Sequence, residues 1–117
     1  MPGPEELLTR MVEGVFNEPD ADRRAAVIAE VFAADVVFTD DARTVTGHAE
    51  LADTVTGLLA QGPGFVFTHA GPFRGVEDLG MQPWRLGPPG GDPVLGGLDV
   101  VQVADGRIAR LWTLLDA

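Results

Sequence analysis

The sequence of 117 residues contains no serine, cysteine, lysine or tyrosine. Without those side chains the protein cannot form a Ser-His-Asp or Cys-His triad, a Schiff-base lysine, a thiolate metal site or a disulfide. Its chemistry is limited to Asp, Glu, Thr, Arg, the indole N–H and two histidines. The histidines have no HxH or HxxxH spacing, so we predict no metal site. We also expect no cofactor.

Positive charge is scarce as well, with 8 arginines against 18 acidic residues and a formal net charge of −10. This charge repels nucleic acid and anionic membranes, so we expect neither as a partner. No apolar run approaches the ~20 residues of a membrane span, and we expect no secretory signal at the first residues. The length fits one domain over residues 1–117, and the absence of cysteine fits a cytoplasmic protein.

The first half of the chain has helical periodicity. Three segments carry apolar residues at helical spacing and are predicted as helices: 5–17, 20–33 and 48–60. Asp20 or Asp22 stands where the second helix needs an N-cap. Residues 36–39, between the second and third helices, are rich in β-branched and aromatic side chains and predict a strand.

The second half changes to the alternation of strands. Four segments are predicted as strands: 65–69, 79–86, 94–104 and 107–115. Asp105 and Gly106 form a tight-hairpin signal, residues 87–93 a turn, and residues 71–75 a loop or bulge. Helices followed by an antiparallel meander give an α+β fold. We predict a cone-shaped roll, with three helices packed on a curved, mostly antiparallel sheet around an apolar pocket.

Three stretches of this layout resemble the nuclear transport factor 2-like superfamily, and more narrowly its SnoaL-like and ketosteroid-isomerase-like members. They are the segment 32–40, the Thr-Gly-His at 46–48 and the final hairpin at 97–112. The resemblance covers residues 5–116, and it is specific for the fold rather than for one activity. As the resemblance implies, the superfamily includes isomerases, cyclases, epoxide hydrolases, dehydratases and binding domains that catalyse nothing.

In the ketosteroid isomerases an aspartate at the end of the first strand moves a proton next to a ketone, and a protonated aspartate and a tyrosine donate hydrogen bonds to the resulting oxyanion. The resemblance assigns the base to Asp40 and the protonated donor to Asp99. Phe16 occupies the tyrosine position and cannot donate. The indole of Trp84, that of Trp112, or His69 could replace that donor.

Each carboxyl also has a simpler explanation. Asp40 follows a strand and could be an ordinary turn residue, with Asp41 a solvated neighbour. Asp99 is flanked by apolar residues and by alternation shares a face with Val101. A carboxyl on an apolar face must pair, coordinate something or stay protonated, unless that face is solvated or an arginine lies opposite.

Other candidates line the predicted pocket. His69 falls on the same strand face as Phe67 and could act as an acid or base near neutral pH, although it could equally be a hydrogen-bonded core residue. The candidate ligand-binding side chains, each of which could also be plain core, are Phe16, Phe32, Phe38, Val55, Leu59, Phe67, Trp84, Val101 and Trp112.

We therefore expect a cofactor-independent isomerase or cyclase that acts by proton transfer on a small hydrophobic carbonyl compound, polyketide- or steroid-like. The alternative is a non-catalytic domain of the same fold that binds a hydrophobic ligand or a partner protein. The outward sheet face, with Leu98, Val100, Leu111 and Thr113 or their alternates, is apolar enough to predict a homodimer.

Overall fold

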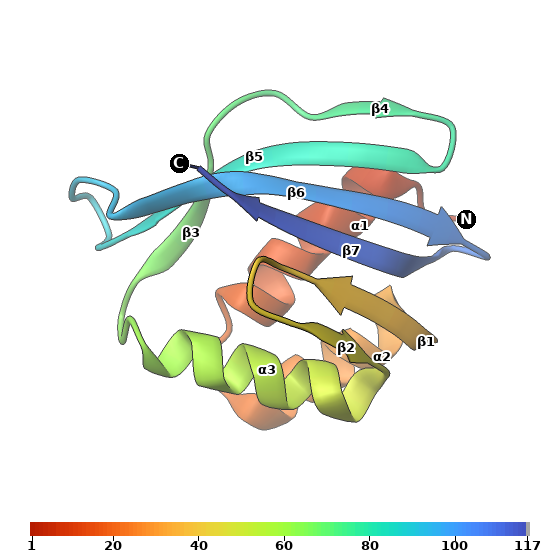
Figure 1. Ribbon diagram of the computed structural model, residues 1–117, viewed down its shortest axis with the longest axis horizontal. Coiled ribbons are helices and arrows are strands. Elements are labelled where there is room, and N and C mark those ends of the chain that lie inside the picture. Colours follow the sequence, from red (N-terminus) through yellow and green to blue (C-terminus); the bar gives the residue numbers. More distant parts are fainter. Residues whose placement is uncertain (117) are drawn as a thin grey trace.

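Helices pack against one face of a curved sheet in the computed structural model, which describes residues 1–116 (Figure 1). The helices are α1 (Pro4–Met11), α2 (Ala21–Val31) and α3 (His48–Ala60), close to the predicted ranges. The side chain of Asp20 caps α2 by accepting hydrogen bonds from the backbone of Asp22 (2.9 Å) and Arg23 (3.0 Å), as predicted. No helix of the described chain is long and apolar enough to cross a membrane.

The first predicted helix is not α-helical throughout. After α1 the chain continues as one π-helical turn, η1 (Val12–Phe16), in which the Asn17 N–H donates to the carbonyl of Val12, five residues back (2.9 Å). A π turn holds one more residue than an α turn and therefore rotates the side chains at its end and directly after it. Here those side chains are Phe16 and Asn17, and both prove to belong to the candidate site.

The sheet has seven strands in the order β2-β1-β7-β6-β5-β3, with β4 also paired to β5. Their bounds are β1 Phe32–Thr39, β2 Thr44–Thr46, β3 Val66–His69, β4 Arg74–Val76, β5 Leu79–Gly87, β6 Leu95–Ala104 and β7 Arg107–Leu115. All pairs are antiparallel except β1 with β7. Asp105 and Gly106 both have positive φ and make the tight β6–β7 turn that their sequence predicts.

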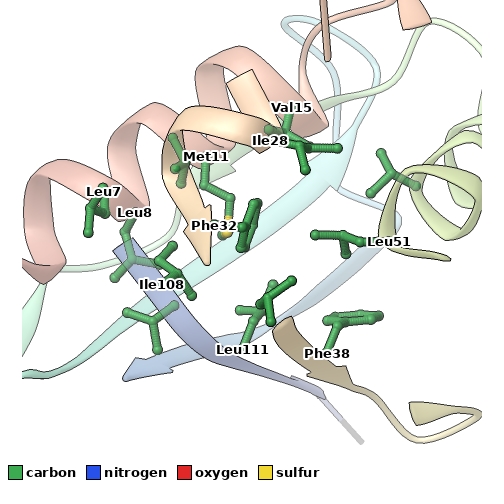
Figure 2. Packing of buried hydrophobic residues seen from close by; sticks show 14 of the residues in the cluster. Leu7, Leu8, Met11, Val15, Ile28, Phe32, Phe38, Leu51, Ile108 and Leu111 are labelled. Carbon is green, nitrogen blue, oxygen red and sulfur yellow. The ribbon is translucent and has the colours of Figure 1, made fainter. Parts of the chain in front are cut away.

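The core fills one end of the space between helices and sheet, as Figure 2 shows around Phe32, Met11 and Leu111. Burying each such side chain stabilises the fold by about 1.5–3 kcal/mol. Along the β6–β7 pair, Val101 opposite Leu111 is fully buried core, whereas Asp99 opposite Thr113, two residues along, lines a cavity. The cone is therefore solid at one end and hollow at the other.

Candidate functional site

The hollow end of the cone is a cavity of about 430 Å³, within the range of small-molecule sites. Its walls come from η1, the end of β1 with the turn after it, the end of α3, and strands β3, β5, β6 and β7. Most of the lining side chains are aromatic or aliphatic. Asp40, Asp41 and Asp99 bring three carboxyl groups to it, and Arg43 brings one cation.

Asp99 lies in the middle of β6, between Gln82 of β5 and Thr113 of β7, and is only 8% exposed. Burial disfavours the charged carboxylate and raises the pKa of Asp99 to about 7. The Thr113 hydroxyl donates to Oδ1 (2.8 Å), which opposes part of that rise. The Trp84 indole also faces this carboxyl and lowers its pKa, although it forms no well-aligned hydrogen bond. Near neutral pH a large fraction of Asp99 is therefore an uncharged acid.

Asp40 follows directly on Thr39, the last residue of β1, and its side chain is 9% exposed. Its Oδ1 accepts hydrogen bonds from the backbone N–H groups of Ala42 and Arg43, both at 2.9 Å. The Arg43 Nε lies 3.6 Å from the same oxygen. All three contacts use Oδ1, so they fix the carboxylate at the cavity wall and leave Oδ2 for another partner. N–H donors and a guanidinium suit a carboxylate anion.

An aromatic row forms one wall of the cavity. Phe16 meets Phe67 edge to face, and Phe67 meets Trp84 in the same way, each pair with ring centroids 5.4 Å apart. Asn17 holds this wall in place, because its amide donates to the carbonyl of Phe67 (2.9 Å) and accepts from the Phe67 N–H (2.8 Å). The π turn and edge strand β3 are thereby joined where Phe16 and Phe67 enter the cavity.

Of the predicted ligand-binding residues, four line this cavity: Phe16, Phe38, Phe67 and Trp84. Five others do not. Phe32, Val55 and Val101 are buried in the core, and Leu59 packs against it.

Trp112 is on the opposite, outward face of the sheet, stacked beneath the guanidinium of Arg110 at 4.6 Å. A bulge causes this difference. Val103 pairs with Ile108 but Gln102 pairs with Arg110, so Ala109 is an extra residue in β7. Without the bulge Trp112 would lie opposite Asp99 and face inward. Instead, Thr113 lies opposite Asp99, and both Thr113 and Leu111 point inward. The outward face of β7 therefore carries the residues that alternate with them, Trp112 and Leu114.

The structure does not bring His69 to the two aspartates. It is the last residue of edge strand β3, one position beyond Thr68, and its side chain is exposed and absent from the cavity wall. The other histidine, His48, starts α3 and contacts the Phe32 carbonyl through Nε2 (2.9 Å), away from the cavity. The chemistry of this cavity therefore depends on its carboxyls, Arg43, Thr113 and the indole of Trp84.

Sequence reasoning missed several residues of the cavity wall. They include Arg43 and Thr113, and the apolar Leu58, Phe65, Leu86 and Leu95. Leu86 could have been found, since alternation along β5 places it on the face of Trp84. Arg43 had no comparable signal, because it lies in a turn whose shape comes from the side chain of Asp40.

The model of one protein family, the SnoaL-like domain, matches residues 8–111 of this sequence. The chain therefore belongs to the SnoaL-like domain family, as its helix–strand order and final hairpin predict. No curated protein matches the sequence.

Solved structures share the fold. A proposed isomerase of the SnoaL-like family from Agrobacterium tumefaciens str. C58 is 28% identical, with a TM-score of 0.89, and the match covers 97% of each chain. A proposed SnoaL-like polyketide cyclase from Jannaschia sp. CCS1 is 16% identical, with a TM-score of 0.80, over 99% of this chain and 90% of that one. A proposed ketosteroid isomerase from Kribbella flavida DSM 17836 is 19% identical, with a TM-score of 0.72, over 96% of this chain and 76% of that one. The last two likenesses establish the fold alone.

Proposed function

We propose that the protein is a cofactor-independent isomerase or cyclase that transfers a proton within a small hydrophobic carbonyl compound, polyketide- or steroid-like. One observation carries the proposal: Asp99, a buried carboxyl whose pKa is raised to about 7, shares an apolar cavity with a second carboxyl held by N–H donors, Asp40. A hydrogen-bond donor for the carbonyl oxygen and a proton acceptor in one cavity are what this chemistry needs. The isomerase assignment of the related Agrobacterium tumefaciens structure agrees with it.

In the proposed reaction the Asp40 carboxylate removes a proton from the carbon next to the ketone. The electron pair moves onto the carbonyl oxygen, and the O–H of neutral Asp99 stabilises that oxygen as it gains charge. Asp40 then returns the proton to a different carbon, which completes an isomerisation. In a cyclase the enolate carbon instead attacks a second carbonyl of the same molecule, and the proton returns to the new alkoxide.

A non-catalytic hydrophobic-ligand-binding or protein-interaction domain is the alternative. It is favoured by the absence of tyrosine and by Phe16, which lines the cavity with a ring that cannot donate a hydrogen bond. Both functions need the cavity, so binding of an apolar compound alone does not separate them. Transfer of a carbon-bound proton does.

The test is hydrogen–deuterium exchange at the carbon next to the carbonyl, followed by proton NMR on a panel of cyclic β,γ-unsaturated ketones and β-diketones. We expect exchange above the solvent rate, reduced about 100-fold or more by Asp40→Asn. Asp53→Asn, which removes an exposed carboxyl on α3, is the matched control and should leave the rate unchanged. Binding with neither exchange nor migration of the double bond across the panel, or full exchange in Asp40→Asn, would count against the proposal.

We further propose that the protein acts in the cytoplasm, because a chain without cysteine gains nothing from an oxidising compartment. Cell fractionation followed by detection with an antibody against the chain would test this. Recovery in a secreted or periplasmic fraction would contradict it.

A further inference from the structure

The indole N–H of Trp84 is a buried donor that faces the Asp99 carboxyl but has no acceptor at hydrogen-bonding geometry in the described chain. Trp84 lies in the middle of β5, is 5% exposed, and forms part of the cavity wall. Buried tryptophan N–H groups usually have a partner, because an unmade hydrogen bond away from water is costly. A donor of this kind in the wall of a cavity points to an acceptor on the ligand.

The position of this indole is fixed on two sides. Phe67 packs edge to face with the ring, and Gly97, the partner of Trp84 on β6, also lies against it. A Cβ atom at Gly97 would lie 2.6 Å from Cζ2 and 2.9 Å from Cε2, the carbon bonded to Nε1. Only glycine therefore lets the nitrogen-bearing edge of the indole lie this close to β6. Asp99 is two residues further along β6, on the same face.

The side-chain donors beside Asp99 on the neighbouring strands are already engaged. The amide of Gln82, its partner on β5, donates to the carbonyls of Gly71 (2.7 Å) and Pro83 (3.2 Å). Thr113 donates to Oδ1 of Asp99 (2.8 Å), which leaves the proton of the uncharged carboxyl to Oδ2. Two donors are then free at one place in an apolar wall: the Asp99 O–H and the Trp84 N–H.

We propose that Trp84 Nε1–H and the Asp99 carboxyl together bind a single oxygen of the ligand, and that this ligand is a conjugated ketone, enol or phenol whose oxygen carries negative charge during the reaction. Trp84 is thereby a catalytic residue, the donor that Phe16 cannot supply. This inference rests on the proposed function for its catalytic part, but the binding of such an oxygen can be measured without any turnover.

Matched small ligands test the donor pair. The probes are 4-fluorophenol, more acidic polyfluorinated phenols, and 4-fluorotoluene, which has the same shape without the oxygen. Dissociation constants are measured by fluorine NMR at about pH 6, below the pKa of about 7 of Asp99. We expect affinity to rise with phenol acidity. Trp84→Phe should weaken phenol binding about 10-fold or more and leave 4-fluorotoluene almost unchanged, since a hydrogen bond to a charged acceptor is worth that much. Trp112→Phe, on the outward face, is the control and should change neither.

A second measurement does not depend on a variant that folds. In ¹⁵N-labelled wild-type protein, phenol should shift the indole N–H resonance of Trp84 downfield and leave that of Trp112 in place. A Trp84 resonance that does not move would overturn the inference. So would a Trp84→Phe variant that prefers phenol to fluorotoluene as strongly as wild type does. If phenol binding depends on Trp84 but no ketone exchange occurs, the donor pair is supported and the isomerase function is refuted. If exchange occurs but is insensitive to Trp84→Phe, the isomerase function is supported and the role of Trp84 is refuted.

Discussion

At the scale of single residues, Asp99 shows how position on a strand sets chemistry. Asp35 of β1 is also in a strand but is exposed, whereas Asp99 is in the middle of a strand that is buried on its inner face. Its one side-chain hydrogen bond, from Thr113, does not offset the loss of water around the carboxylate. The fold therefore keeps an acid that is free to give up a proton near pH 7.

This burial makes the stability of the protein depend on pH. Between an unfolded pKa of 3.8 and a folded pKa of about 7, the folded state holds a proton that the unfolded state has lost. Stability therefore falls as pH rises through this window. From about pH 5.5 to about pH 8.5 we expect wild type to lose about 2 kcal/mol through Asp99, and Asp99→Asn to lose none of it.

Urea denaturation of both proteins at the two pH values measures this difference. Asp53→Asn, at an exposed position, should keep the wild-type pH dependence. The same slope in Asp99→Asn and wild type would mean that Asp99 is already ionised in the folded protein at about pH 5.5, and that the cavity does not hold a neutral acid.

At the scale of elements, the site depends on the junction between η1 and β3. Asn17 uses both ends of its amide on the backbone of Phe67, as a neighbouring strand would. Edge strand β3 is only four residues long and has one strand partner, β5, so this side chain supplies pairing that the sheet lacks. The aromatic wall of the cavity is thus positioned by a polar residue that follows a π turn.

We predict that Asn17→Leu destabilises the protein by about 1–3 kcal/mol, because it leaves the Phe67 N–H and C=O without partners. Denaturant titration gives the free energy of unfolding. Relative to wild type, amide exchange in the variant should become faster in β3 than in β6. Thr68→Leu, an exposed neighbour on β3, serves as the control and should change stability little. Unchanged protection of the Phe67 amide in Asn17→Leu would refute this role.

The sequence predicts long periodic elements well and short or irregular ones poorly. The three helices and the long strands β5, β6 and β7 follow directly from apolar periodicity. Strands β2 and β4 have three residues each, too few to show alternation, and form because neighbouring strands offer open edges.

The same distinction holds in the site. Asp99 and Trp84 lie on regular stretches, and alternation or apolar context pointed to both. Trp112 was misplaced because Ala109 bulges from β7, and bulges leave no clear mark in a single sequence. His69 is where its strand ends, and the extent of a four-residue edge strand is set by its partners rather than by its own residues. Residue spacing therefore locates a site only as far as the register stays regular.

At the scale of the whole molecule, the outward face of the sheet carries apolar side chains although it does not line the cavity. Leu98 and Val100 of β6 lie beside Leu114 and Trp112 of β7 on this face, and Leu114 is 53% exposed. An exposed apolar surface of this kind is typical of an interface.

We propose that two copies of the chain associate through this face as a homodimer, and predict that Leu98→Glu disrupts it. A glutamate there would be buried without a partner in a two-fold interface, and it would occur in both copies. Sedimentation equilibrium should give twice the chain mass for wild type and a concentration-dependent shift toward monomer for Leu98→Glu. Val76→Glu, at an exposed apolar residue of β4, adds the same charge elsewhere and should remain dimeric. A monomeric wild type at micromolar concentration would contradict the proposal, and so would a Leu98→Glu variant that dimerises as tightly as Val76→Glu.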